Sequence, residues 1–422
     1  MNPILKQTLS VLKNPHTLVY LAFASVFVHY VITAAVIILL GFYLVLNPNT
    51  AKKVFAFKGK GVWIAFTVYA LLIALFHKNY IGAACTLGFF FIFAISYYTR
   101  SIITEQVFEN CLDLCCFAAF PLTFSAIIEK LLHMPKSEEV QIGLFNWLLS
   151  SEYRCAGWCF NPNYLCALFA AIIIICAFKV TSHKKNKNSV FVYYFLAATA
   201  AVGLYLGGSL FALVEVFVGL CVLLVLQRKH LMLAMFLAAV GISIVMIFFI
   251  PNLLPRLSES EHTTDLRVII WDQAMGFIKE NPLFGRGFLT FYQHYLEDPV
   301  NIYYTTHAHN FALEGLLSFG VVGCVLILML LWSYYRKVTE CKELLRSNCA
   351  TTLILTISAA VLIHMTTDMT IIWMQTALLY LLIMGGVGID EKALDKRILA
   401  CAQGGGLSDR RSNEKDNEQL KD

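Results

Sequence analysis

Charged residues are scarce in this sequence. They make up 14% of its 422 residues, against roughly 25% in an average soluble protein, while hydrophobic residues make up 59% and the mean hydropathy is +0.69. Apolar runs of about 20 residues recur along the chain, which is the length that a helix needs to cross a bilayer. The composition therefore excludes an ordinary soluble protein and predicts an all-α polytopic membrane protein. The formal charge of +5 does not indicate nucleic-acid binding, because the basic residues are scattered over short loops.

Several other signatures are absent. The 13 cysteines form no CxxC pair and most lie in apolar segments, so neither a zinc site nor a redox motif is predicted. Cys155 and Cys159 flank AGW in a loop and can pair only if that loop faces an oxidising side, which the sequence leaves open. The start, MNPILKQTLSVLKNPHTL, lacks the apolar core and cleavage site of a signal peptide, so we expect the first hydrophobic segment to remain as an anchor.

Twelve apolar segments are candidate membrane spans, although residues 17–47 can form either one long tilted helix or two short ones. Cytoplasmic loops carry an excess of Lys and Arg, and the four basic loops fall on one side only if residues 17–47 cross twice. The prediction is about 12 spans with both termini in the cytoplasm. The segments are 17–29, 31–47, 61–76, 80–98, 107–128, 160–180, 190–206, 209–226, 231–250, 312–335, 350–364 and 370–388, and the basic loops are 52–60, 179–187, 227–230 and 336–346.

Residues 1–388 are expected to form one transmembrane domain, followed by a charged tail, 389–422, that is expected to be disordered in the cytoplasm. The long loop 251–311 falls on the opposite face, and long loops of this kind are uncommon unless they are functional. Within it, residues 266–280 predict an amphipathic helix lying at the membrane interface. Its apolar face comprises Leu266, Ile270, Ala274 and Phe277, Thr264 or Asp265 caps its start, and Asn281-Pro282 stops it.

Two arginines of this loop are candidate anion ligands. Arg267 is expected in the first turn of the helix, where a cation opposes the helix dipole. It either pairs with Asp265 or another loop carboxylate, or it binds a phosphate or diphosphate through its bidentate fork. Arg286, in a GRG turn, leaves the same alternatives open.

The stretch THAHNFALEGLLSFGVVG, residues 306–323, places His309 and Asn310 where the loop becomes a span. A helix N-terminus attracts anions and lowers the pKa of a nearby histidine, which keeps His309 neutral and able to accept a proton. The alternative is an interfacial histidine bonded to a neighbouring helix. Glu314 either pairs with a loop arginine or belongs to the site. His307 is not expected to be catalytic, and the glycines of the stretch, including Gly320, are expected to let spans pack closely.

The remaining polar clusters fall on the same outer face. They are Arg154 with the Asn161-Pro162-Asn163 turn, Asp368 in a very short loop, and the turn Gly207-Gly208-Ser209. A single outer site is the simplest hypothesis. The outer loops contain no triplet of acids suited to a metal, so neither a metal nor a cofactor is expected.

These residues resemble a known family. His309-Asn310, then nine residues, then GVVG resembles the signature of bacterial O-antigen ligases. LRVIIWDQAMGFIKENPLFGRGFLTF, RCAGWCFNPN and TTDMTIIW resemble further segments of the O-antigen ligase and polymerase superfamily. The resemblance covers roughly residues 150–388, in the family's order.

The resemblance implies a GT-C-type glycosyltransferase in the cytoplasmic (inner) membrane of a bacterium. Such enzymes transfer a glycan from undecaprenyl diphosphate to an acceptor hydroxyl on a glycolipid or cell-wall glycan, outside the membrane, with inversion and without a metal. By position, His309 resembles the family's essential histidine and Arg267 its diphosphate-binding arginine. The expected substrate-binding residues are Arg154, Arg286, Asn310, Glu314 and Asp368.

One departure concerns the outer turn, where the family often has Ser-Arg-Gly and this chain has Ser209-Leu210-Phe211. Either Arg154 or Arg286 replaces the missing arginine, or the substrate differs. A repeat-unit polymerase and a cell-wall polysaccharide ligase therefore stay open beside the ligase. A lipid-linked oligosaccharide transporter is a further alternative, but its polar groups would be expected at the bilayer midplane, where only Asp113 and Glu215 are candidates. A non-catalytic scaffold is disfavoured by the clustered arginines and histidine.

Overall fold

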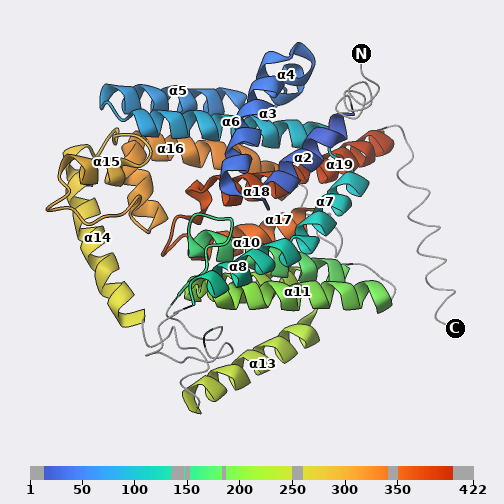
Figure 1. The fold of residues 1–422 in the computed structure, drawn as a ribbon. Coiled ribbons are helices and arrows are strands. Elements are labelled where there is room, and N and C mark those ends of the chain that lie inside the picture. Colours follow the sequence, from blue (N-terminus) through green and yellow to red (C-terminus); the bar gives the residue numbers. More distant parts are fainter. Residues whose placement is uncertain are drawn as a thin grey trace, which may run out of the picture.

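The computed structural model describes residues 14–134, 147, 153–182, 187–249, 260–340 and 350–402, and within these ranges every regular element is a helix (Figure 1). The elements are α2 (Pro15–Ser25), α3 (Tyr30–Leu46), α4 (Pro48–Val54), α5 (Lys60–Phe76), α6 (Tyr80–Ile102), α7 (Glu105–Phe117), α8 (Ala119–Leu132), α10 (Pro162–Ser182), α11 (Lys187–Gly207), α12 (Leu210–Leu226), α13 (His230–Phe249), α14 (Ser260–Glu280), α15 (Thr290–Glu297), α16 (Phe311–Glu340), α17 (Ala350–His364), the 3-10 turn η4 (Thr370–Ile372), α18 (Met374–Gly385) and α19 (Val387–Ala402).

The helices confirm a polytopic membrane protein. By length and composition, six helical segments of the described chain can cross a bilayer: Tyr80–Ile102, Glu105–Leu132, Pro162–Ser182, Ser189–Gly207, His230–Ile247 and Phe311–Arg336. Helices α3 and α4, bent by 98° at their junction, make a seventh if they count as one span. Helices α5, α12 and α17 are apolar but shorter. Residues 17–47 contain two helices, α2 and α3, rather than one long tilted helix.

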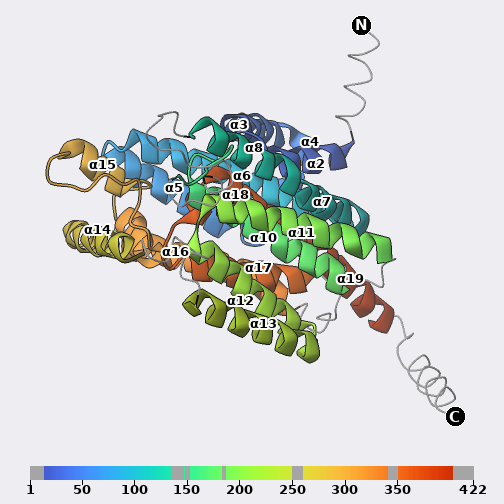
Figure 2. The ribbon, with the colours of Figure 1, turned by 60° about the horizontal axis from the view of Figure 1, so that its bottom comes forward.

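The helices form a bundle with distinct ends. In Figures 1 and 2, α14 and α15 lie at one end of the bundle, and α19 lies at the other. Helix α10 is the most enclosed candidate span, with 83% of its apolar window buried, and it contacts α7, α8, α11, α12, α17 and α18. Helix α13 lies at the periphery, with 0% of its window buried. The bundle is therefore organised around α10.

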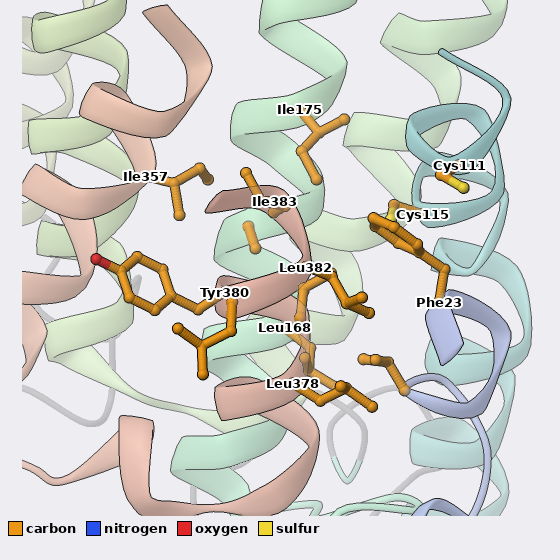
Figure 3. Packing of buried hydrophobic residues seen from close by; sticks show 14 of the residues in the cluster. Phe23, Cys111, Cys115, Leu168, Ile175, Ile357, Leu378, Tyr380, Leu382 and Ile383 are labelled. Carbon is orange, nitrogen blue, oxygen red and sulfur yellow. The ribbon is translucent and has the colours of Figure 1, made fainter. Parts of the chain in front are cut away.

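The core lies between α2, α7, α10, α17 and α18. Figure 3 shows Phe23, Cys115, Leu168, Ile357 and Leu382 meeting there from these helices, and each is at most 2% exposed. Lipid tails are as apolar as these side chains, so close packing rather than escape from water stabilises this arrangement.

The cysteines contribute to the core as small apolar groups rather than as cross-links. Cys155 and Cys159 are both free and buried, so in the described part of the chain no disulfide joins them. This answers the question that the sequence left open for this pair.

The two acids that the sequence places within spans are paired. Asp113 forms an ion pair with the buried Lys179 at 2.7 Å, and Glu215 accepts a hydrogen bond from His364 at 2.6 Å. Buried charges are stable in a bilayer only with such partners. Each pair joins two helices of the bundle, α7 to α10 and α12 to α17.

The prediction of a disordered tail is wrong for residues 389–402, which belong to α19. Contacts with the bundle hold this helix. Glu391 forms an ion pair with Arg100 of α6 at 2.6 Å, and Asp390 accepts a hydrogen bond from the Thr351 backbone N–H at 2.7 Å. The charged residues thus have partners that are distant in sequence. Residues 403–422 lie outside the described residues.

Helix α14 begins earlier than predicted. It starts at Ser260 rather than near Leu266, so Thr264 and Asp265 lie inside it and cannot cap it. Arg267 consequently lies beyond the first turn, and the predicted conflict with the helix dipole does not arise. Ser260 with the following glutamate supplies residue types that favour a helix start. The end at Glu280 and the buried face containing Ile270 and Ala274 are confirmed.

Candidate active site

A break in α16 fixes the loop that follows α14. Gly320 has φ 57° and ψ −171°, which interrupts the helix. The backbone N–H groups of Val321 and Val322 donate to the carbonyls of Pro282 and Leu283, each at 3.0 Å. A Cβ on Gly320 would lie 2.3 Å from the Leu283 carbonyl carbon, so only glycine fits. The prediction that Gly320 serves span-to-span packing is wrong, because it accommodates this loop.

The start of α16 is held by two predicted site residues. The Asn310 side-chain oxygen accepts hydrogen bonds from the N–H groups of Ala312 and Leu313 at 3.0 and 3.1 Å, which makes Asn310 the helix cap. The buried Glu314 carboxylate accepts from the Ala308 N–H at 2.8 Å and from the Ser318 hydroxyl at 2.8 Å. Glu314 therefore joins the backbone just before His309 to a side chain of α16, and among the described residues it pairs with no loop arginine.

His309 has a strained backbone. Its φ is 50°, a left-handed conformation that costs a side-chain-bearing residue about 1 kcal/mol or more. The flanking bonds to Ala308 and Asn310 hold it there. The imidazole Nδ1 lies 3.3 Å from Asp368 Oδ1, and Nε2 lies 3.3 Å from the Thr305 hydroxyl. Strain of this kind concentrates at functional sites.

Asp368 is the acceptor at the centre of the site. Its buried carboxylate accepts hydrogen bonds from His307 Nε2 at 2.8 Å, from the Met369 backbone N–H at 2.7 Å and from the Asn163 side-chain amide. His307, which the sequence left unexplained, thus orients Asp368. A second link joins the two loops, because the Asn310 amide donates to the Thr366 carbonyl at 3.0 Å.

The charges of this cluster favour a neutral His309. Burial lowers the pKa of His309, and the proximity of His307 and of the Arg267 guanidinium lowers it further, against the opposing effect of Asp368. Burial raises the pKa of Asp368, but the hydrogen bond from His307 and the nearby His309 imidazole outweigh it and hold that pKa well below the usual range. Near neutral pH the pair is therefore an uncharged imidazole beside a carboxylate.

These groups open onto a cavity of about 240 Å³. Four of the predicted site residues line it together: His309, Arg267, Arg154 and Asp368. The other three, Arg286, Asn310 and Glu314, are not among the described residues that line it. The lining comprises Arg154, Asn163, Gly208, Ser209, Leu210, Phe211, Leu266, Arg267, Ile270, Tyr303, His309, His364, Thr367 and Asp368.

Arg154 lies across the turn from which the family arginine is missing. Its Nε donates to the Gly207 carbonyl at 3.0 Å and its Nη2 to the Asn163 side-chain oxygen at 2.6 Å. Gly208 has φ 59°, and a Cβ placed there would lie 3.6 Å from the Arg154 side chain. Both Arg154 and Leu210 line the cavity, so Arg154 borders the same space as the position where the family often has arginine.

Arg267 faces the same turn from α14. Its guanidinium lies over the Phe211 ring, 5.4 Å from the ring centroid. The two arginines therefore flank the turn 207–211 and share one cavity with His309.

Arg286 belongs to a different cluster. Its guanidinium donates to His294 at 2.9 Å and lies 3.5 Å from Glu297 and 3.9 Å from Glu280. Burial and the charge of Arg286 lower the pKa of His294 to about 4, so His294 is neutral and can accept this hydrogen bond. Arg286 thus ties α14 to α15 and is not placed to replace the missing family arginine.

Sequence reasoning assigned no role to His364, which also lines the cavity. Its Nδ1 donates to Glu215, 149 positions away in sequence, and its Nε2 is buried without a hydrogen-bond partner among the described residues. The sequence signal is a lone histidine at the end of an apolar segment. Only the pairing with Glu215 of α12 gives that histidine a fixed orientation.

The nitrogen and oxygen atoms of His307, His309 and Asp368 that could bind a metal lie within 4.8 Å of one another. Two histidines and one carboxylate are also a common ligand set for a divalent metal. The direct hydrogen bond from His307 to Asp368 satisfies both groups through a proton. The geometry therefore fits an orienting triad as well as a metal site, and chelation distinguishes the two.

The comparison with known families bears on the segment that carries most of this site. Residues 195–328 match the O-antigen ligase family model. The match confirms the resemblance to the ligase and polymerase superfamily and indicates a ligase- or polymerase-like function in surface polysaccharide assembly. The matched segment contains Arg267 and His309, whereas Arg154 and Asp368 lie outside it. No curated protein matches the chain.

Proposed function

We propose that this protein transfers a glycan from undecaprenyl diphosphate to an acceptor hydroxyl at the outer face of the cytoplasmic membrane. The observation that carries the proposal is the shared cavity, in which His309 faces the same space as Arg154 and Arg267 and is backed by Asp368. A proton acceptor and two cations in one cavity suit the displacement of a diphosphate by a hydroxyl.

In the proposed step, the acceptor oxygen forms a bond to the anomeric carbon while the carbon–oxygen bond to the diphosphate breaks. Neutral His309 takes the hydroxyl proton, and Asp368 stabilises the imidazolium that results. The bonding electrons leave with the diphosphate, whose charge Arg154 and Arg267 stabilise through bidentate hydrogen bonds. Direct displacement inverts the configuration at the sugar carbon, and the proposed step needs no further reactant.

The proposed orientation follows from where each helix begins and ends. Helix α6 begins at Tyr80, after its cap Asn79, whose side-chain amide donates to the Phe288 carbonyl of the loop 251–311, and it carries Arg100 in its last turn. Helix α10 begins beside Asn163, which donates to Asp368, and carries Lys179 in its last turn. The basic residues at the far end make that end cytoplasmic. Twelve crossings of the GT-C type, with both termini inside, accommodate this alternation.

Ligase and polymerase differ only in the acceptor, which is a glycolipid or wall glycan in one case and another lipid-linked repeat in the other. A transporter is less well supported. A transporter would use Asp113 and Glu215, the acids within spans. In the described structure these are paired with Lys179 and His364.

The test is glycan transfer by the purified protein, with undecaprenyl-diphosphate glycan and each acceptor in turn. We expect His309→Ala to lower the rate by roughly 10²-fold or more, the usual contribution of a positioned base. His230→Ala is the matched control, because His230 is exposed at the start of α13. A His309→Ala protein that inserts normally and transfers at the wild-type rate contradicts the proposal.

Chelation is a separate arm of this test. We propose a metal-independent reaction, so transfer is expected to survive dialysis against EDTA. Loss of transfer that zinc or another divalent ion restores would instead assign His307, His309 and Asp368 to a metal site.

A further inference from the structure

A second cavity lies at the opposite end of the bundle from His309. Its volume is about 500 Å³, and it is bounded by the α4–α5 connection, the end of α6, α16 and α19. Four cations and two carboxylates line it, which gives it a formal charge of +2: Lys53, Lys58, Arg100, Lys392, Glu391 and Asp395. The proposed reaction uses none of these residues.

Arg100 forms the buried floor of this cavity. It is 9% exposed, and its guanidinium lies between the rings of Phe57 and Tyr334, 4.9 and 5.0 Å from their centroids. Its Nε and Nη2 donate to Glu391 at 2.9 and 2.6 Å. Its Nη1 is buried and meets no hydrogen-bond partner among the residues that the structure describes. The guanidinium therefore lies in the floor of the cavity, where Glu391 is its only carboxylate partner among the described residues.

The lysines leave positive charge available. No ion pair joins Lys53 or Lys58 to a carboxylate of the described residues, and Lys53 lies only over the Tyr98 ring, at 5.9 Å. Lys392 donates to the Ile103 carbonyl at 2.9 Å, which holds the charge in place without neutralising it. An anion entering the cavity therefore meets three ammonium groups above a buried guanidinium.

The surroundings place this anion at a bilayer surface. Trp332, next to the lining residue Ser333, is 71% exposed, and Leu46, at the end of α3, is 73% exposed. Trp is enriched at the membrane–water boundary, and exposed leucine at the end of an apolar helix indicates contact with lipid tails. The cavity therefore lies at the level of lipid headgroups, where basic pockets between helices bind anionic lipids.

We propose that this cavity binds the phosphate headgroup of an anionic bilayer lipid, with Lys53, Lys58 and Lys392 around the phosphate and Arg100 beneath it. The lipid fills the gap between α4, α6, α16 and α19. It thereby joins α19 to the bundle, in addition to the Arg100–Glu391 pair.

The test uses the full-length protein in detergent and measures binding of phosphatidylglycerol by native mass spectrometry, with phosphatidylcholine as the zwitterionic comparison. The exposed lysines allow a folded variant, Lys53→Ala with Lys58→Ala. We expect this pair to weaken phosphatidylglycerol binding roughly ten- to thirtyfold, as two lysines at an anionic surface should. The matched control is Lys52→Ala with Lys60→Ala, which removes the same charge from exposed positions of the same segment that do not line the cavity.

Equal binding by the two double variants would overturn the proposal, and so would equal affinity of the wild type for the two lipids. A third arm adds inorganic phosphate as competitor. If phosphate at millimolar concentration displaces the lipid and raises the Tm as much as the lipid does, the site recognises a free phosphate and the lipid assignment fails. Binding does not depend on glycan transfer, so these outcomes are independent of the proposed reaction.

Discussion

Arg154 offers the sharpest test of the proposal that the cavity lined by His309 binds a diphosphate. The turn 209–211 lacks the arginine that the ligase family often has, and Arg154 reaches the same space from the segment before α10. Arg154→Ala removes that cation. Introducing Leu210→Arg into the same variant returns an arginine at the family's position, on the other side of the Gly208 turn.

The expected magnitude follows from the contacts. A hydrogen bond between charged groups is worth about 1.5–3 kcal/mol, and about 1.4 kcal/mol corresponds to a tenfold change in rate. Loss of Arg154 should therefore lower kcat/KM for the donor roughly 10- to 150-fold. The variant also frees the Asn163 oxygen that Arg154 now binds at 2.6 Å, which weakens the orientation of Asp368. Arg154→Lys keeps the charge without the fork and should fall between the wild type and Arg154→Ala.

The assay is donor-dependent transfer at saturating acceptor, with the Tm of each variant measured alongside. Leu210→Arg in the Arg154→Ala background should raise kcat/KM about tenfold above that of Arg154→Ala alone, since one charged contact is restored. Leu210→Gln is the uncharged control and should recover nothing. Wild-type kinetics for Arg154→Ala, or equal recovery with arginine and glutamine at position 210, would refute diphosphate binding by Arg154.

Two further predictions concern His309, the proposed proton acceptor, and the break in α16 at Gly320. Because the pKa of His309 is lowered from 6.5, the neutral base persists below that pH, and kcat/KM measured from about pH 8 to 5 should fall with a midpoint below 6.5; a midpoint above 6.5 contradicts this charge balance. Gly320→Ala should lower the free energy of unfolding by about 2 kcal/mol or more, because alanine there would need a left-handed φ and would clash with Leu283. The measurement is the Tm, which should fall. Gly241→Ala is the control and should leave the Tm unchanged, because a Cβ there meets no atom within 4 Å.

The all-helical, membrane-spanning character of the chain was predictable because apolar length and loop charge are local properties of a membrane protein. The two helices within residues 17–47 were identified from loop charges alone. The start of α14 was missed, because the apolar pattern begins at Leu266 while the helix itself begins at Ser260. The tail was misjudged for a related reason. Its charges look solvated in sequence, but Glu391 has a partner in Arg100, 291 positions away.

The candidate site was predictable at the level of which residues share a face. His309, Arg267, Arg154 and Asp368 were placed on one side by counting spans, and the structure brings all four to one cavity. Their hydrogen-bond partners were not predictable, because Asn163 and Asp368 are 205 positions apart. Asn310 and Glu314 were chosen for their position beside His309. The structure gives them backbone partners instead, a distinction that sequence spacing does not contain.

The broken α16 has a consequence for how this site can change. Backbone bonds at Val321 and Val322 lock the loop after α14 into the helix that His309 precedes. His309, the proposed proton acceptor, and Arg267, the proposed phosphate ligand, are thus held in a common frame by main-chain atoms. We therefore expect substitutions in the lining, such as those at Leu210, to alter which glycan or acceptor fits without moving the proposed reacting groups apart. On the proposed function, specificity could then change while the reaction itself is kept.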